Sequence, residues 1–560
     1  MPRAEDLPRP SDYAELGRTW KGDLVAGVTV GIVALPLALA FGVSSGVGAQ
    51  AGLITAIVAG VAAAVFGGSN VQVSGPTGAM VVVLAPIVAR SGVGAVALLT
   101  ILAGIVLFVL GASRVGRAVS WIPWPVIEGF TLGIGAIIFL QQVPSALASP
   151  VPAGENALVA AVRSALGAAW PQAGVSLAIA ASVAALMLAL PRLHRSLPAS
   201  LIAIAAATPA VALLHVDTPL IGHLPPALPL PGIPTMDLAQ LPSLAGSVIA
   251  IAVLAAIESL LSARVASGLV GPDGRTTGPF NADRELVGQG IASVAAGLFG
   301  GMPATGAIAR TAVNVRSGGR TRAAAIVHAL VLIAIVYLAA PLVGMIPLAA
   351  LAGVLMATAA RMVSPRTVKT VLGSTRADAA AFVLTAVITV SFDLIVAIEI
   401  GIACAAFLTL RKLAGLGTVR REPIAGPAQE GDGRIAVFRL DGLMFFGAAD
   451  RVLAELAAVA DAEVVILRLS QLRYLDATGA QALVEIIREL ERRGITVLLK
   501  GVQDEHLALV TRVGVIAELR HHRHLFDTLP DAIEHARSHI RRNAAARTGP
   551  RGPEAPPALP

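Results

Sequence analysis

Long apolar runs fill most of this 560-residue chain, and charged residues become frequent only after about residue 411. An apolar run of about twenty residues has the length that an α-helix needs to cross a bilayer. The pattern therefore predicts an all-α membrane domain over residues 22–413, after a cytoplasmic N-terminal segment, 1–21. Fourteen apolar segments are predicted, near 24–44, 50–67, 77–90, 94–111, 122–142, 172–190, 199–214, 244–264, 286–300, 306–316, 323–340, 344–361, 378–393 and 394–411.

The basic residues of the membrane domain gather in alternate loops. Basic residues precede the first segment and follow the even-numbered ones, whereas the odd-numbered loops hold only Arg90 and Arg163. Because cytoplasmic loops are enriched in arginine and lysine, this split predicts an even number of spans with both termini in the cytoplasm of a bacterium. Basic loops also account for the formal net charge of +7, so we expect no nucleic-acid partner.

Two stretches of the membrane domain repeat one motif. SGPTGA at 74–79 and MPATGA at 302–307 each place a proline shortly before Thr-Gly-Ala, near an Ala/Gly-rich run that ends in Phe-Gly-Gly. The apolar runs that follow, Gly78–Ala89 and Gly306–Val315, are too short to cross a bilayer. We therefore predict that the third and tenth segments are half-helices that begin near the midplane and meet head to head, as in the binding sites of transporters.

The chemistry expected of such a pair comes from the backbone. A helix N-terminus carries unpaired N–H groups and about half a positive elementary charge, so two facing termini suit a small anion. The alternative is that the threonines only cap their helices and the glycines only permit close packing. The predicted anion-binding residues of the two motifs are Thr77, Gly78, Ala79, Thr305, Gly306 and Ala307.

Two ionisable residues lie inside apolar segments, where each costs about 2.5–3.5 kcal/mol even on a lenient insertion scale. Arg310 is expected to add positive potential behind the anion pocket, the alternative being a structural charge. Glu258 would repel an anion, which predicts that it binds a coupling cation, either Na⁺ or a proton. Ser262, one turn later, is a candidate oxygen ligand for Na⁺. The alternative is a salt bridge between Glu258 and Arg310 with no bound cation.

The order of several motifs resembles that of the SulP family of anion transporters, which includes sulfate permeases and bicarbonate transporters. These motifs are ALPLALAFGVSSG (34–46), SGPTGAM (74–80), WPVIEGFTLGIG (124–135), AAIESLLSARVA (255–266) and GGMPATGAIARTAVNVRSGGRTR (300–322). The resemblance implies a homodimer with a uracil-permease-like inverted repeat of seven plus seven spans, with repeats at about 22–214 and 244–413.

The same resemblance implies the residues of the site. The anion would lie between the third and tenth helices, next to a break in the first helix around Pro36 and Leu37. On the tenth helix it would contact the backbone of Gly306, Ala307 and Ile308. The first-helix stretch and the acid at 258 are most similar to those of the sodium-dependent bicarbonate transporters. In those transporters, an acid, a hydroxyl one turn later and the tenth-helix backbone bind Na⁺. The corresponding residues are Glu258, Ser262, Gly306, Ala307 and Ile308. Glutamate stands at position 258 where those transporters have aspartate, and it is equally compatible with a proton.

A small α/β domain is predicted over 433–543, after a linker at 414–432, because short β-rich runs alternate with amphipathic segments there. DATG at 476–479 resembles the signature of a STAS domain, in which Thr478 takes the position of a phosphorylated hydroxyl. We favour a structural role, in which Thr478 and Gln481 form a capping box for a helix at 478–493.

Two further stretches of the C-terminal part are predicted to lack a fixed role. HHRH at 521–524 has no metal-ligand spacing with a cysteine or a second histidine pair, so we interpret it as a solvated surface run. Residues 544–560 are expected to be disordered, since they are rich in alanine, proline and arginine.

The leading hypothesis is a secondary active transporter of a small oxyanion, sulfate or bicarbonate, in the bacterial inner membrane, coupled to Na⁺ or proton symport. Two alternatives stay open: a nucleobase permease on the same fold, and an anion-binding membrane sensor that signals through the STAS domain. The sequence offers no nucleophile paired with a base, so we expect no enzyme and no cofactor other than the coupling cation. The expected partners are the anion, membrane lipid and a second copy of the chain.

Overall fold

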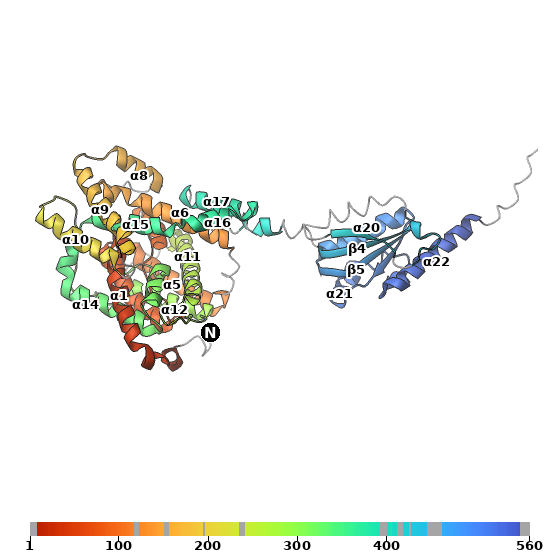
Figure 1. Cartoon of the computed structure of the whole chain (residues 1–560), viewed down its shortest axis with the longest axis horizontal. Helices are drawn as coiled ribbons and strands as arrows, with labels where there is room; N and C mark the ends of the chain where they lie inside the picture. The colour runs from red at the N-terminus through yellow and green to blue at the C-terminus, as the bar shows by residue number, and fades with distance from the viewer. Residues whose placement is uncertain are drawn as a thin grey trace, which may run out of the picture. The chain divides into compact units, whose positions relative to one another are not determined.

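The computed structural model divides the chain into two compact units, residues 1–405 and 406–560. The first unit is mostly helical, and the second is built around a β-sheet (Figure 1). The structure describes residues 8–116, 123–150, 156–193, 197–234, 241–391, 400–401, 403–404, 406–410, 418–424, 427–444 and 462–548.

The helices of the first unit follow the predicted apolar segments. Each predicted segment up to 378–393 overlaps a described helix, and the last, 394–411, lies partly outside the described residues. The count of fourteen spans therefore stays a prediction. The helices are α1 (Leu16–Ser44), α2 (Ala49–Ile54), the π-helical turn η3 (Thr55–Ala59), α3 (Gly60–Phe66), α4 (Gly78–Ser91), α5 (Gly94–Ala112), α6 (Trp124–Gln141), α7 (Val143–Ala146), α8 (Ala157–Leu166), α9 (Gln172–Leu193), α10 (Ala199–Leu213), α11 (Leu241–Ser267), α12 (Ala282–Leu298), α13 (Ile308–Arg316), α14 (Arg322–Gly344), α15 (Leu348–Met362), α16 (Pro365–Leu372) and α17 (Arg376–Ser391).

The outer surface of this unit is apolar as well as its interior. Within the described residues, eight helical stretches, some of them made of consecutive helices, are long and apolar enough to cross a membrane. On α14, Leu330, Tyr337 and Leu338 are all exposed, Leu338 by 83%. An exposed apolar surface of this extent is unfavourable in water but not in hydrocarbon, where helices satisfy their own backbone groups. The first unit is therefore a multi-pass membrane domain.

Helix α1 corrects one prediction. It runs through Pro36 without interruption, so the expected break around Pro36 and Leu37 is wrong. Proline removes a helical hydrogen bond, but a membrane helix tolerates this loss where neighbouring helices enclose it. Here Pro36 is buried, and α2 packs so closely that a Cβ added to Gly52 would lie 2.0 Å from the carbonyl oxygen of Ala38.

Two short helices of the first unit, α8 and α16, have no counterpart among the predicted segments. Each begins at a side chain that caps it: Asn156 accepts a hydrogen bond from the amide of Leu158 at 2.9 Å, and Ser364 accepts one from Thr367 at 3.3 Å. Both helices are too short to cross a membrane, and a search for long apolar runs therefore passes over them.

The C-terminal unit has a five-stranded sheet in the order β3-β4-β5-β6-β7, in which only the β3–β4 pair is antiparallel. Its helices cover both faces. The elements are β3 (Thr418–Glu422), η6 (Asp432–Arg434), β4 (Ile435–Met444), β5 (Val464–Leu475), α20 (Ala477–Arg492), β6 (Thr496–Lys500), α21 (Asp504–Val513), η7 (His522–His524), β7 (Leu525–Phe526) and α22 (Leu529–Thr548).

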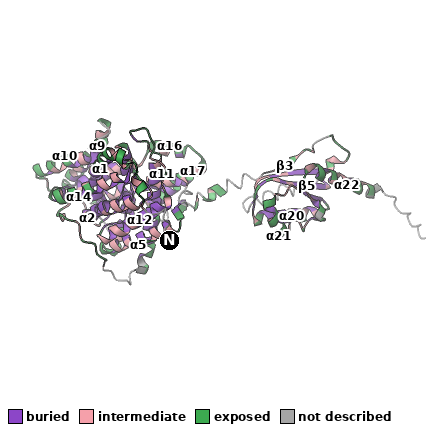
Figure 2. Ribbon diagram, turned by 90° about the horizontal axis from the view of Figure 1, so that it is seen from below, coloured by how far each residue is buried: buried purple, intermediate pink, exposed green. Residues whose placement is uncertain are grey.

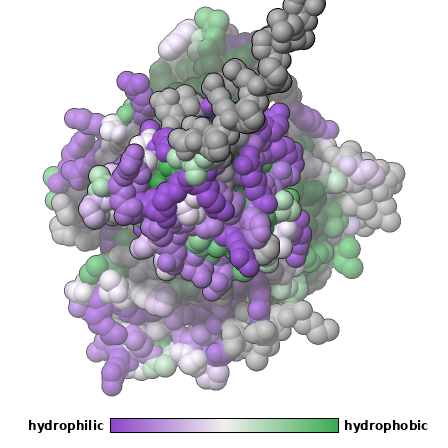
Figure 3. All heavy atoms as spheres, turned by 90° about the vertical axis from the view of Figure 1, so that its right-hand side faces the viewer, coloured by the Kyte–Doolittle hydropathy of each residue, from purple (hydrophilic) through white to green (hydrophobic). Residues whose placement is uncertain are grey.

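Alternation along the strands builds two cores in this unit. On β4, Ala436 and Phe438 belong to the core beneath α20 and α21, whereas Ile435 and Val437 belong to the core beneath α22. Figure 2 shows buried residues on the sheet and on the helix faces turned toward it. The face of this unit seen in Figure 3 is largely hydrophilic, as expected of a domain in water.

Three predictions about the C-terminal unit are wrong in detail. Strand β3 lies inside the predicted linker 414–432, and α22 continues to Thr548, into the stretch expected to be disordered. The N-cap of α20 is Asp476, whose side chain accepts from the amide of Gly479 at 2.7 Å. Thr478 is an exposed residue inside the first turn of that helix and not its cap. Residues 549–560 lie outside the described part of the chain.

We predict that Asp476→Ala lowers the free energy of unfolding of the C-terminal unit by about 1 kcal/mol, because the first turn of α20 loses its acceptor. Thr478→Ala is the matched control and should stay within about 0.5 kcal/mol of the wild type. Calorimetry of the full chain in detergent, with hydrogen exchange of the α20 amides, measures both. Equal destabilisation by the two variants would return the capping role to Thr478.

Candidate functional site

The two Thr-Gly-Ala motifs lie in direct contact in the middle of the first unit. Strand β1 (Ser74–Gly75) pairs antiparallel with β2 (Thr305–Gly306), with Ser74 opposite Gly306 and Gly75 opposite Thr305. The amide of Ala307 extends this ladder by donating to the carbonyl of Val73 at 2.9 Å. Both strands are buried. The two copies of the motif, which are far apart in the sequence, therefore pair as one two-stranded ladder.

A short helix follows each strand of this ladder. The 14 residues of α4 span about 21 Å and the 9 residues of α13 about 14 Å, whereas the hydrocarbon core is about 30 Å thick. The prediction that neither segment crosses alone is confirmed. Each helix begins within three residues of its strand, so both N-termini lie beside the ladder.

The open amides of these N-termini lie slightly further along the chain than the motif suggested. Val81 donates the first backbone bond of α4 and Thr311 that of α13, so the amides of 78–80 and 308–310 keep no backbone acceptor in the described structure. The amides of Gly306 and Ala307 are already paired, with the Ser259 hydroxyl and the Val73 carbonyl. Among the predicted anion ligands, Gly78, Ala79 and Ile308 therefore keep a free donor.

Glu258 of α11 joins the two motifs. Its Oε2 accepts hydrogen bonds from the hydroxyls of Thr77 at 2.7 Å and of Thr305 at 2.8 Å, and those two hydroxyl oxygens lie 2.9 Å apart. Thr77 occupies the N-cap position of α4, but its side chain makes no capping hydrogen bond. The alternative that the two threonines only cap their helices is therefore not what the structure contains.

Two serines of α11 extend the site. Ser259, which the sequence analysis overlooked, accepts a hydrogen bond from the amide of Gly306 at 3.1 Å. Ser262 is fully buried, and within the described residues its hydroxyl has no hydrogen-bond partner. A buried polar group without a partner costs about 1–3 kcal/mol, so this hydroxyl is an unused ligand close to Glu258 in the sequence.

Arg310 is almost fully buried on α13. Its Nη2 donates to the carbonyl of Pro76 at 2.5 Å, and its Nη1 has no partner among the described groups. A Cβ added to Gly75 would lie 2.6 Å from that Nη1, so glycine is needed for the guanidinium to approach the ladder. The described contacts of Arg310 and Glu258 include no ion pair between them, which argues against the salt-bridge alternative.

A group of buried polar side chains holds the first motif in place, and the sequence analysis missed it. Its centre is Glu285, which lies on α12 one residue before the predicted segment 286–300. Gln289, four residues on, shares its helix face. The carboxylate accepts from the amides of Gly68 at 2.8 Å and Ser69 at 3.0 Å and from the side-chain amides of Gln72 and Gln289, both at 2.9 Å. Gln289 also donates to the Ser74 hydroxyl of β1 at 2.6 Å.

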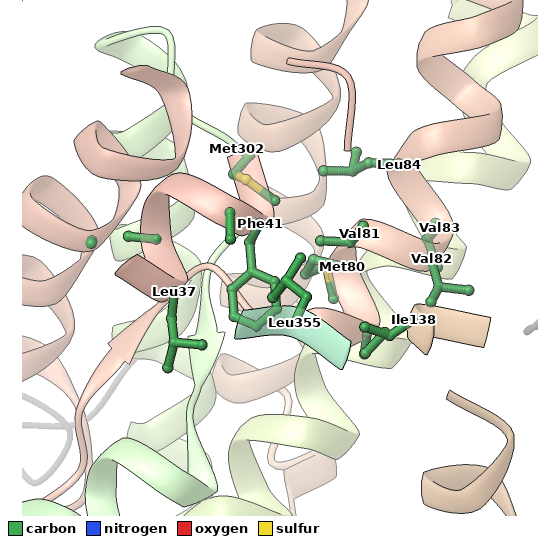
Figure 4. Close-up of a cluster of buried hydrophobic side chains, with 14 of the residues drawn as sticks. Leu37, Phe41, Met80, Val81, Val82, Val83, Leu84, Ile138, Met302 and Leu355 are labelled. Atoms are coloured by element: carbon green, nitrogen blue, oxygen red, sulfur yellow. The ribbon is translucent and has the colours of Figure 1, made fainter. Parts of the chain in front are cut away.

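Apolar side chains line the other side of the α4 N-terminus. Figure 4 shows Leu37 and Phe41 of α1 near Met80 of α4, in one buried cluster. A Cβ added to Gly78 would lie 2.3 Å from Cδ1 of Ile138, so the start of α4 packs directly against a side chain of α6. Leu37 thus contributes to a hydrophobic wall, and polarity on this side comes from the helix backbone.

Known protein families and relatives match most of the chain. A model of the sulfate permease family matches residues 20–385, and a STAS domain model matches 427–532. The putative sulfate transporter YvdB of Bacillus subtilis is 31% identical over 520 residues, covering 90% of this chain and 96% of its own length. The bicarbonate transporter BicA of Synechocystis sp. is 30% identical over 507 residues, covering 86% of this chain and 88% of its own.

Solved structures agree with these sequence matches. SLC26A9 superimposes with a TM-score of 0.81 at 15% identity, covering 95% of this chain and 92% of that one, which supports the fold. The transmembrane domain of a cyanobacterial BicA is 31% identical with a TM-score of 0.59, covering 69% of this chain and 97% of that one. The prediction that the chain is not an enzyme is confirmed by these matches to permeases. The chain belongs to the sulfate permease family and carries a C-terminal STAS domain.

Proposed function

We propose that this chain is a secondary active transporter of a small oxyanion, sulfate or bicarbonate, which it carries by symport with Na⁺ or a proton. The observation that carries the proposal is the ladder of β1 and β2, beside which both α4 and α13 begin. The names of the relatives YvdB and BicA support the class of substrate. Alternating access around this site, a homodimer and the bacterial inner membrane complete the proposal.

The anion would bind to the backbone at these two helix ends. Each N-terminus contributes about half a positive elementary charge, and the amides of 78–80 and 308–310 are available as donors. The guanidinium of Arg310 adds a full charge, with its Nη1 still unpaired. Such a site binds an anion without requiring a flexible charged side chain to be desolvated and ordered for each cycle.

Glu258 would couple the anion to a cation. As a free carboxylate it holds the hydroxyls of Thr77 and Thr305, and its charge repels an anion. Protonation of Glu258, or Na⁺ bound to it with the unpaired hydroxyl of Ser262, cancels that charge and releases hydroxyl donors toward the anion. Each ligand then increases the affinity for the other, by the typical 1–3 kcal/mol of coupled sites, equivalent to about 5–150-fold.

The first prediction tests transport itself. Purified protein in proteoliposomes should accumulate radiolabelled sulfate or bicarbonate when an inward Na⁺ or proton gradient is imposed, and each gradient is applied separately to identify the cation. Protein-free liposomes are the control. Anion binding with no uptake under either gradient would overturn the proposal and favour an anion sensor that acts through the STAS domain.

Glu258→Gln should abolish gradient-driven accumulation, because a neutral amide cannot gain a proton or a cation charge. Anion binding should remain measurable, since the donors of α4 and α13 are kept. Glu128→Gln is the matched control, because Glu128 lies on α6 and pairs with Trp124 at 2.9 Å, away from the ladder. Wild-type accumulation by Glu258→Gln would remove this residue from the coupling step.

Arg310→Ala should weaken anion affinity about tenfold or more, because a hydrogen bond to a charged group contributes about 1.5–3 kcal/mol. Arg310→Lys, which keeps the charge, should recover part of the loss. The matched control is Arg316→Ala at the exposed end of the same helix. Isothermal titration with sulfate or bicarbonate measures all three variants, and wild-type affinity in correctly folded Arg310→Ala would leave Arg310 a structural role only.

A further inference from the structure

Three histidines of the C-terminal unit converge at one end of its sheet. His524 is the last residue of η7, just before β7, and His535 and His539 lie one turn apart on α22. One ring nitrogen from each lies within 4.8 Å of the others. The prediction that residues 521–524 form a solvated run is therefore wrong for His524, which is buried.

The spacing of the rings suits a shared metal ion. The Nε2 atoms of His535 and His539 lie 3.3 Å apart, and their ring centroids lie 5.5 Å and 5.3 Å from that of His524. Two nitrogens bound to one tetrahedral Zn²⁺ at about 2.0–2.1 Å are themselves about 3.3 Å apart. The observed separation suits a hydrogen bond between the two α22 rings, and it is also that of two ligands on one ion.

A second observation points to a missing ligand. His524 is only 4% exposed, yet its Nδ1 has no hydrogen-bond partner. His524 therefore brings a buried ring nitrogen without a partner to the cluster.

We propose that His524, His535 and His539 form a binding site for a divalent transition-metal ion such as Zn²⁺, with a fourth position open to water or another ligand. Imidazole nitrogens suit zinc, copper, nickel and cobalt, whereas magnesium and calcium prefer oxygen ligands. Because His524 precedes β7 and the other two lie on α22, a bound ion links the edge of the sheet to the C-terminal helix. Because the ion binds the folded unit, this link stabilises the unit by an amount that grows with the logarithm of the metal concentration above the dissociation constant.

Two of the three proposed ligands lie on the C-terminal helix α22, beyond the part of the chain that the STAS domain model matches. The STAS domain model ends at residue 532, so it includes His524 but not His535 or His539. The two α22 histidines are half-buried, which leaves the ion a route from solvent.

The test titrates the metal-free full chain in detergent with Zn²⁺ by isothermal titration, and separately with Co²⁺ by visible absorption. We expect one equivalent bound at this site, a tetrahedral-type Co²⁺ spectrum and a higher melting temperature of the C-terminal unit with Zn²⁺. His535→Gln and His539→Gln should each weaken the affinity at least about tenfold, since even partners of metal ligands contribute about 10–100-fold. His223→Gln, an exposed histidine in the first unit, is the matched control and should match the wild type.

Unchanged zinc affinity in both α22 variants would overturn the proposal. The Co²⁺ spectrum of the wild type gives an answer that depends on no variant, because a spectrum like that of the hydrated ion would also overturn it. Circular dichroism of the variants confirms that a lost signal reflects a lost ligand and not an unfolded helix.

Discussion

Backbone pairing inside the membrane is the constraint on which the rest of this structure depends. A helix that begins at mid-membrane leaves N–H and C=O groups that no water can satisfy, and each unpaired group costs several kcal/mol. The ladder of β1 and β2 satisfies these groups for both motifs at once, with Ser259 and Glu285 pairing the amides beside it. The donors left over are those of the first turns of α4 and α13, and on the proposed function these are the donors that bind the anion.

Charge balance follows from the same arrangement. The site contains one buried acid, Glu258, and one buried base, Arg310, which form no ion pair with each other in the described structure. Their charges sum to zero, and adding one bicarbonate with one monovalent cation, or one sulfate with two, keeps that sum. Either ion alone would leave an uncompensated charge at low dielectric, which is costly. On the proposed function, joint loading of both ions is therefore the least costly path, and it is a physical reason for symport.

The sequence predicted those features of the structure that depend on a short local pattern of residues. Thr-Gly-Ala after a proline, followed by too few apolar residues, was sufficient to locate α4 and α13. It could not give the position of the open amides, since pairing of Gly306 with Ser259 depends on tertiary packing. The break expected at Pro36 failed because neighbouring helices enclose α1, and sequence alone does not report that enclosure. The short helices α8 and α16 carried readable signals in Asn156 and Ser364, which a search for long apolar runs does not use.

The histidines show the same limit in the soluble unit. The spacing of the histidines within residues 521–524 does not suit a metal site formed by that stretch alone. The fold instead brings His524 to α22, where His535 and His539 are four residues apart on one face. Only the i, i+4 pair could be recognised from sequence, and a pair alone does not define a site. The third ligand exists because β7 pairs with β6 at the edge of the sheet, and that pairing places η7 beside the C-terminal helix.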